Sequence, residues 1–148
     1  MSDLRPVDYL LIGHVAVDLT PSGKQLGGTV SYAALTAKAM GLQVGIVTSA
    51  GEDAPLSLLD GVQILNLPTE QSTIFENVKT EHGRKQTLHH QATKISFEHV
   101  PQIWRDAAIV HLAPIVQEVD PALVGQFPAS WVGATPQGWI RGWDEKGS

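Results

Sequence analysis

The stretch from Thr29 to Met40 constrains the fold of this chain more than any other feature. Neither glycine nor proline interrupts it, alanine is abundant, and apolar residues recur at helical spacing. The pair Gly27-Gly28 stands at its start and Gly41 at its end, where a left-handed backbone costs glycine little. The stretch therefore predicts a helix whose small alanines let it pack closely on a sheet.

Short apolar segments flank this helix. The segment from Val7 to Ile12 predicts a buried strand, and the segment from Gln43 to Ser49 predicts the strand that follows the helix. Strand, helix and strand in this order imply a right-handed crossover between parallel strands. Further strands are predicted at 62–67, 108–112 and 131–133, and weak helices or helical turns at 55–60, 96–107 and 121–126. The alternation predicts an α/β fold with a mainly parallel sheet in one domain.

Two segments depart from this alternation. The residues between Val15 and Gly28 fit two short strands or a loop equally well. The segment from Ser72 to Gln91 has strand-forming residues on both sides of a polar turn, which predicts a β-hairpin. Because this hairpin has little apolar surface, we expect it to lie at an edge or project as a flap.

Composition excludes several classes of protein. The chain has 148 residues, of which 43% are hydrophobic and 17% charged, so it is neither disordered nor collagen-like, and no apolar run is long enough to span a membrane. Its formal charge of −5 leaves no broad basic surface, and we expect no nucleic-acid partner. It has no cysteine, which excludes disulfides and zinc-thiolate sites and fits a cytoplasmic location.

The polar residues that follow the strands form the candidate site. No P-loop, Gly-x-Gly-x-x-Gly, Gly-x-Ser-x-Gly or His-Glu-x-x-His motif is present, and we expect no metal site among the histidines. Asp18, Gly27-Gly28 and Asp53 could instead converge on the hydroxyls of a small polyol. The alternative is structural, with Asp18 capping a turn and the glycines permitting a sharp entry to the helix.

The chain resembles the ribokinase-like (PfkB) carbohydrate kinases across nearly its whole length. The spacing of the first family signature and three further segments carry this resemblance: Gly27-Gly28, Ala34, Gly41 and Gly51; Ile12 to Asp18; Ser72-Thr73; and His111 to Pro114. The resemblance implies a three-layer fold with helices on both faces of the sheet and residues 72–91 as a lid. It also implies that Asp18, Gly27 and Gly28 bind the acceptor. In the lid, Asn77, Lys79, Arg84, Gln86 and His89 are candidates for ligand or partner contacts.

The sequence departs from the family pattern at two places. Tyr32 stands where the signature has an asparagine, and it could stack on a ring or narrow the pocket. A nucleoside or an aromatic alcohol therefore competes with a simple sugar as the acceptor. The alternative is that Tyr32 packs against the sheet. The family's anion hole, catalytic aspartate and nucleotide pocket belong to a C-terminal half that has no counterpart here. ATP and Mg²⁺ are therefore implied for the parent enzyme, and we expect neither to bind tightly to this chain.

The sequence predicts the substrate-binding half of an ATP-dependent sugar or nucleoside kinase, inactive alone, with residues 1–148 as one truncated α/β domain and no catalytic residue of its own. The alternative is a non-catalytic binding or assembly module.

Trp139, Ile140 and Trp143 would form an adhesive surface if nothing covers them, so we expect a homo-oligomer or contact with the missing half. Glu118 could reach the acceptor cleft, but capping the helix near Pro121 is the preferred interpretation.

Overall fold

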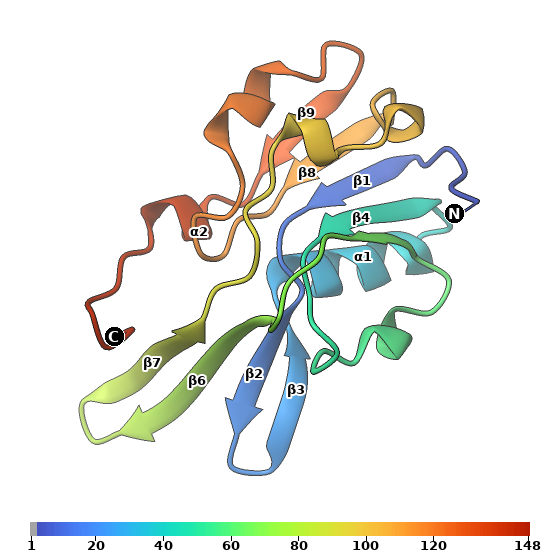
Figure 1. Ribbon diagram of the computed structural model, residues 1–148. Helices are drawn as coiled ribbons and strands as arrows, with labels where there is room; N and C mark the ends of the chain where they lie inside the picture. The colour runs from blue at the N-terminus through green and yellow to red at the C-terminus, as the bar shows by residue number, and fades with distance from the viewer. Residues whose placement is uncertain (1–2) are drawn as a thin grey trace.

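Two β-sheets make up the computed structural model, which describes residues 3–148 (Figure 1). The larger sheet has the strand order β5-β4-β1-β8-β9, and every neighbouring pair in it is parallel. Its strands are β1 (Tyr9–Ile12), β4 (Val44–Thr48), β5 (Gln63–Asn66), β8 (Ile109–Leu112) and β9 (Trp131–Ala134). The predicted α/β class and parallel sheet are confirmed.

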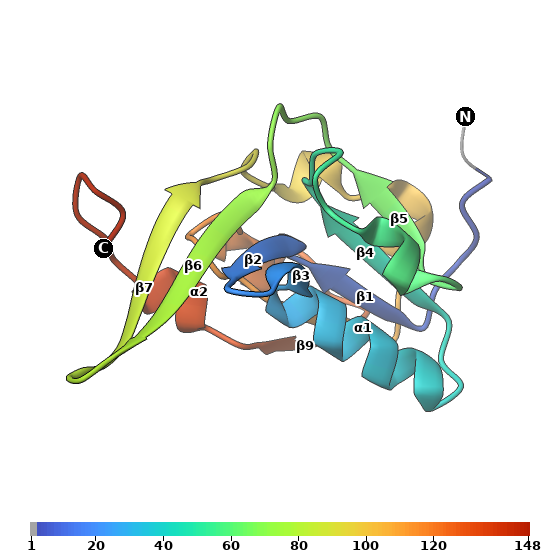
Figure 2. The same ribbon diagram turned by 90° about the horizontal axis from the view of Figure 1, so that it is seen from below.

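Helix α1 (Thr29–Ala39) covers one face of the larger sheet (Figure 2). Its inner residues Val30, Ala34 and Ala37 are buried in one apolar cluster with Leu11 of β1 and Ile46 of β4. The alanines leave little side-chain volume between the helix and the strands, as the sequence predicts. Burying each large aliphatic side chain in this cluster contributes about 1.5–3 kcal/mol to folding.

The opposite face of the larger sheet is covered by short 3-10 helices. Leu10 and Ile12 alternate with Leu11 along β1 and pack with the fully buried Trp104 on this second face. Three of the weak helices predicted from the sequence lie on this face: η2 (Phe97–His99), η3 (Gln102–Trp104) and η4 (Pro121–Gly125). The fourth, η1 (Leu56–Leu59), packs on the α1 side through the buried Leu59. The three layers are thus confirmed, with a thin second helical layer.

The smaller sheet projects from one end of the larger sheet, in the order β3-β2-β6-β7. Its strands are β2 (Ala16–Thr20), β3 (Gly23–Gly27), β6 (Thr73–Thr80) and β7 (Gly83–His90). The predicted hairpin is confirmed as β6 and β7. The segment before α1, which the sequence left open, is a second hairpin, and its strand β2 pairs in parallel with β6.

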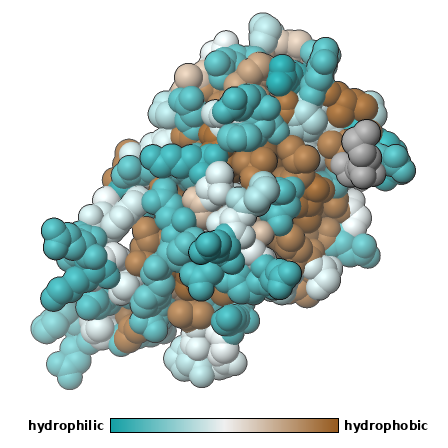
Figure 3. Space-filling model, viewed as in Figure 1, coloured by the Kyte–Doolittle hydropathy of each residue, from teal (hydrophilic) through white to brown (hydrophobic). Residues whose placement is uncertain are grey.

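The surface of the molecule reflects this division. In Figure 3, hydrophobic residues gather over the larger sheet, whereas the β6–β7 hairpin is mostly hydrophilic. Residues 3–148 contain no helix that is long and apolar enough to cross a membrane.

The tryptophan-rich end of the chain is only partly covered. A short helix that the sequence did not predict, α2 (Gln137–Ile140), lies beside the smaller sheet. Trp139 and Trp143 are half-buried against the apolar clusters, and the indole of Trp139 donates a hydrogen bond to the Val119 carbonyl oxygen at 2.7 Å. Ile140 and Trp131 are 82% and 84% exposed. Of the three side chains in the expected adhesive surface, Ile140 is therefore the exposed one, and the exposed Trp131 lies outside that set. The oligomeric state stays a prediction.

We expect Gly28→Ala to lower the free energy of unfolding by about 2–4 kcal/mol, measured by equilibrium urea denaturation. Gly28 has a φ of 89°, and a Cβ there would overlap the carbonyl oxygen of His14. Gly41 has nearly the same φ, 87°, but open space around its Cα, so Gly41→Ala should cost only about 1 kcal/mol. Equal losses in the two variants would show that the contact with His14 is unimportant.

Candidate functional site

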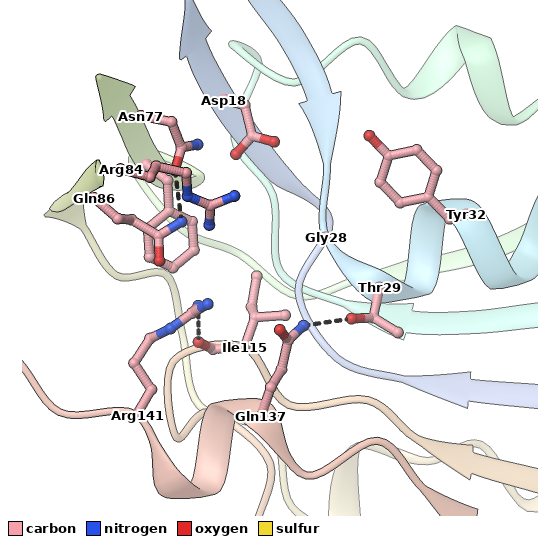
Figure 4. Close-up of a pocket in the computed structure, with 11 residues that line it drawn as sticks. Asp18, Gly28, Thr29, Tyr32, Asn77, Arg84, Gln86, Ile115, Gln137 and Arg141 are labelled. Atoms are coloured by element: carbon pink, nitrogen blue, oxygen red, sulfur yellow. Dashed lines mark hydrogen bonds between the residues drawn. The ribbon is translucent and has the colours of Figure 1, made fainter. Parts of the chain in front are cut away.

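A cavity of about 270 Å³ lies between the smaller sheet, the start of α1 and the segments that follow β8 and α2. Figure 4 shows polar side chains entering it from several directions. Its lining comes from five separate parts of the chain: Asp18; Gly28, Thr29 and Tyr32; Phe75, Asn77, Arg84 and Gln86; Ile115; and Gln137 and Arg141.

Asp18 projects from β2 into this cavity (Figure 4). A Cβ at Gly27, its neighbour on β3, would lie 2.5 Å from the Asp18 Oδ2 atom, so glycine leaves room for the carboxylate. Partial burial raises the pKa of Asp18 above its ordinary value, and the nearby Arg84 and Arg141 oppose that rise. Asp18 therefore offers a partly desolvated hydrogen-bond acceptor to whatever occupies the cavity.

Tyr32 stands on the first turns of α1 at the open side of the cavity. Its side chain is 63% exposed, and its hydroxyl lies 3.5 Å from the carbonyl oxygen of Leu26. The ring therefore does not pack against the sheet, which was one of the two alternatives, and one side of it is open to a ligand.

Asp53 does not line the cavity. Its Oδ1 atom accepts hydrogen bonds from the hydroxyl and the backbone N–H of Ser72, at 2.6 and 3.2 Å. The Ser72 hydroxyl oxygen in turn accepts from the backbone N–H of Gly51 at 2.9 Å. The structure thus brings Asp18, Gly28 and Tyr32 together, places Gly27 against Asp18, and gives Asp53 a bracing contact at the start of β6.

The hairpin divides its polar residues between two faces, because successive side chains of a strand point in opposite directions. Asn77, Arg84 and Gln86 line the cavity, and the amide nitrogen of Gln86 donates to the Asn77 carbonyl oxygen at 2.9 Å. Lys79 pairs with Arg84 across the hairpin and shares its face, but it does not line the cavity. His89 belongs to the opposite face, where it lies 3.5 Å from Glu76.

Sequence reasoning missed two cavity residues near the end of the chain. The amide nitrogen of Gln137 donates to the hydroxyl of Thr29 at 2.7 Å. The guanidinium of Arg141 donates to the Ile115 carbonyl oxygen at 2.6 Å and lies 4.8 Å from the centre of the Phe75 ring. No spacing motif marks either residue, since both reach the site only because α2 folds back beside the smaller sheet.

Glu118 does not cap the helix near Pro121, and the preferred sequence interpretation is wrong. The N-cap of η4 is Asp120, whose Oδ1 accepts from the backbone N–H of Ala122 at 2.9 Å. Glu118 is buried, and its carboxylate accepts three backbone N–H groups: those of His14 at 2.9 Å, Ile115 at 2.7 Å and Val116 at 3.0 Å. It therefore ties the loop after β8 to the passage between the two sheets.

His14 is buried beside this carboxylate, with its Nδ1 atom 3.7 Å from Glu118. Its Nε2 atom donates to the carbonyl oxygen of Thr93 at 2.6 Å. Its Nδ1 atom is 2.7 Å from the hydroxyl of Thr73, which also accepts from the backbone N–H of Ala92 and is therefore free to donate to the ring. This pattern fits a neutral imidazole, and burial lowers the pKa of His14, with Glu118 acting in the opposite direction.

A magnesium site is implied for the parent enzyme, and the described residues offer no cluster suited to it. Across residues 3–148, no three His, Cys, Asp or Glu side chains gather so that they could hold a metal ion. We therefore assign no step of the chemistry to a metal held by these residues.

Comparison with known proteins shows which class of protein this chain is similar to. No family model matches the chain. A cytidine kinase from Thermococcus kodakarensis is 31% identical over 128 residues, which cover 76% of this chain and 45% of that protein. A sulfate complex of a pyrophosphate-dependent kinase in the ribokinase family matches with a TM-score of 0.73 and 21% identity, over 93% of this chain and 53% of the other.

Arabidopsis thaliana ribokinase, complexed with ribose and ATP, matches with a TM-score of 0.58 and 16% identity, over 82% of this chain and 48% of the other. The chain thus spans about half the length of these relatives. It has the fold of the ribokinase-like kinases. The fold and the cytidine kinase relative support the resemblance to the ribokinase-like (PfkB) family that the signature spacing around Gly27-Gly28 predicts.

Glu118→Gln should lower the free energy of unfolding by about 2–4 kcal/mol, because one carbonyl oxygen cannot accept all three buried backbone N–H groups. The exposed Glu70 provides the control, and Glu70→Gln should change stability by less than about 0.5 kcal/mol. Equilibrium urea denaturation measures both. Equal stability of the two variants would contradict the bracing role of Glu118.

The free energy of unfolding should also decrease as the pH falls below the ordinary pKa of histidine, because of His14. The unfolded imidazole takes up a proton near pH 6.5, whereas the folded one does so only at lower pH, so the unfolded state binds more protons below that point. The free energy of unfolding, measured between pH 7.5 and 5, should therefore decrease toward acid. His14→Gln should flatten this slope, and His82→Gln, in the exposed hairpin turn, should leave it unchanged. A slope unaffected by His14→Gln would exclude this origin.

Proposed function

We propose that this chain is the acceptor-binding half of an ATP-dependent kinase that phosphorylates a hydroxyl of a sugar or nucleoside. The cavity binds the acceptor, and the phosphoryl donor is held by residues outside this half. Without them the chain is inactive as a kinase, because phosphoryl transfer needs the donor phosphates clamped in line with the attacking hydroxyl. The 31% identity to a cytidine kinase supports the reaction type.

The aspartate inside the cavity is the observation that carries this proposal. A carboxylate accepts hydrogen bonds from hydroxyl groups, and Asp18 is partly desolvated and turned toward the space that an acceptor would fill. The amides of Gln86 and Gln137 reach the same space from two other elements. Such convergent polar groups on an otherwise small pocket fix the orientation of a polyhydroxy ligand.

Tyr32 and the cytidine kinase relative both support a ring-bearing acceptor. The phenol ring borders the cavity and has a free side on which a base could stack. The β6–β7 hairpin lies along the same cavity and would cover the acceptor, excluding water that would otherwise compete for the phosphoryl group.

Replacing Asp18 tests the proposal directly. Calorimetric titration of the chain with cytidine, ribose and myo-inositol should reveal binding of at least one of them. Asp18→Asn should weaken that binding by about tenfold to a hundredfold, because the amide loses a charge-assisted acceptor. Asp106→Asn, an exposed residue outside the cavity, is the matched control and should bind like the unaltered chain. Binding that survives Asp18→Asn unchanged would remove Asp18 from the acceptor site.

A further inference from the structure

Two guanidinium groups face the cavity from opposite walls, a feature that a site for a neutral polyol does not require. Arg84 projects from β7 in the lid hairpin, and Arg141 projects from the segment after α2 (Figure 4). Burial lowers the pKa of Arg141, and the nearby positive charge of Arg84 lowers it further, whereas Glu118 and Asp18 act in the opposite direction. Like charges held near one another in a partly buried site are unfavourable unless an anion lies between them.

Neither arginine has an ionic partner in the part of the chain that the structure describes, residues 3–148. The ion pairs found there join His14 to Glu118 and His89 to Glu76. Arg141 is partly satisfied by the Ile115 carbonyl oxygen and the face of the Phe75 ring. The Arg84 side chain donates no hydrogen bond within residues 3–148, although it points into the cavity.

The side chains that line the cavity carry more positive than negative charge: Arg84 and Arg141 against Asp18. Of the described residues that line it, Asp18 is the one that carries a carboxylate. Glu118 lies near Arg141, but three backbone N–H groups already occupy its oxygens. The start of α1 also borders the cavity, with no acidic residue in its first turn and no capping side chain, so its dipole adds positive potential.

We propose that the acceptor carries a negatively charged group, a carboxylate or a phosphate, which binds between Arg84 and Arg141 while its hydroxyls face Asp18. This inference rests on the proposed function and narrows it from sugars and nucleosides in general to their anionic derivatives. The planar guanidinium pairs with both oxygens of a carboxylate or phosphate, and a cavity with one guanidinium on each wall can hold such a group from both sides.

The two arginines differ in burial and in the contacts that hold their side chains in place, so we expect them to act differently on a bound anion. Arg141 is partly buried, and its contacts with Ile115 and Phe75 hold it in place before a ligand arrives. Arg84 is exposed on the hairpin and lacks such contacts, so an anion would attract it and the hairpin toward the rest of the site. The charge of the acceptor would thereby help to order the lid.

Matched pairs of neutral and anionic compounds test this inference by calorimetry on the intact chain. The pairs are glucose with gluconate, ribose with ribose 5-phosphate, and cytidine with cytidine 5′-monophosphate, and inorganic phosphate alone is titrated as well. We expect the anionic member of at least one pair to bind about tenfold or more tightly than its neutral partner. A preference in the first pair identifies a carboxylate, and a preference in the others identifies a phosphate.

Arginine variants show where any such preference arises. Arg84→Gln and Arg141→Gln should each reduce the ratio of anionic to neutral affinity at least threefold, and the reduction should shrink at high salt. Lys85→Gln removes the same charge from the neighbouring residue on β7, which does not line the cavity, and should keep the ratio. If Lys85→Gln reduces the ratio of anionic to neutral affinity as much as Arg84→Gln does, the preference reflects only the overall charge of the chain, and the inference is overturned.

The failures of the two proposals are distinguishable. If neutral compounds bind as well as the anionic ones and depend on Asp18, the anionic group is wrong and the proposed function stands. If inorganic phosphate alone binds as tightly as the anionic acceptors, the arginines hold a donor phosphoryl group, and the inference about the acceptor is wrong. If no compound binds, both proposals fail.

Discussion

The passage of the chain from β1 into β2 is the contact on which the rest of the structure depends. Here Gly28 lies directly against the backbone of His14, and the carboxylate of Glu118 accepts the His14 N–H. The first contact brings the start of α1 to the junction of the two sheets, and the second brings the loop after β8 to the same place. The larger sheet and the cavity are therefore both held in position at His14. A side chain at position 28 would push the start of α1 away from the backbone of His14.

The division of labour between the sheets follows from burial. The larger sheet is buried on both faces, because α1 covers one and the helices η2, η3 and η4 cover the other, so its position is fixed by packing. The smaller sheet has few apolar side chains and presents Asn77, Arg84 and Gln86 on the face that lines the cavity. The β6–β7 hairpin is held by backbone hydrogen bonds between its strands and by the pairing of β6 with β2 along one edge.

Only part of the candidate site was predictable from the sequence. The predictable residues are close to one another in the sequence, and the others are far apart. Asp18, Gly28 and Tyr32 are close in sequence and belong to a pattern of glycines around one helix, so local reasoning could bring them together. Asp53 was assigned to the site because it follows a strand, but Ser72 holds its carboxylate elsewhere. Arg141 could not be found, since nothing in the sequence around it shows that α2 returns to the β6–β7 hairpin.

The sequence by itself determined the parallel α/β sheet, the helix from Thr29, the polar hairpin and the resemblance to the ribokinase-like kinases, because strand and helix periods and the needs of glycine are local properties. Tertiary structure alone decided that residues 16–27 form a hairpin, that Glu118 accepts three backbone N–H groups, and that Arg84 and Arg141 lie near Asp18. Such arrangements depend on hydrogen bonds and charges between residues far apart in the chain, and these pairings have no periodicity that a sequence could display.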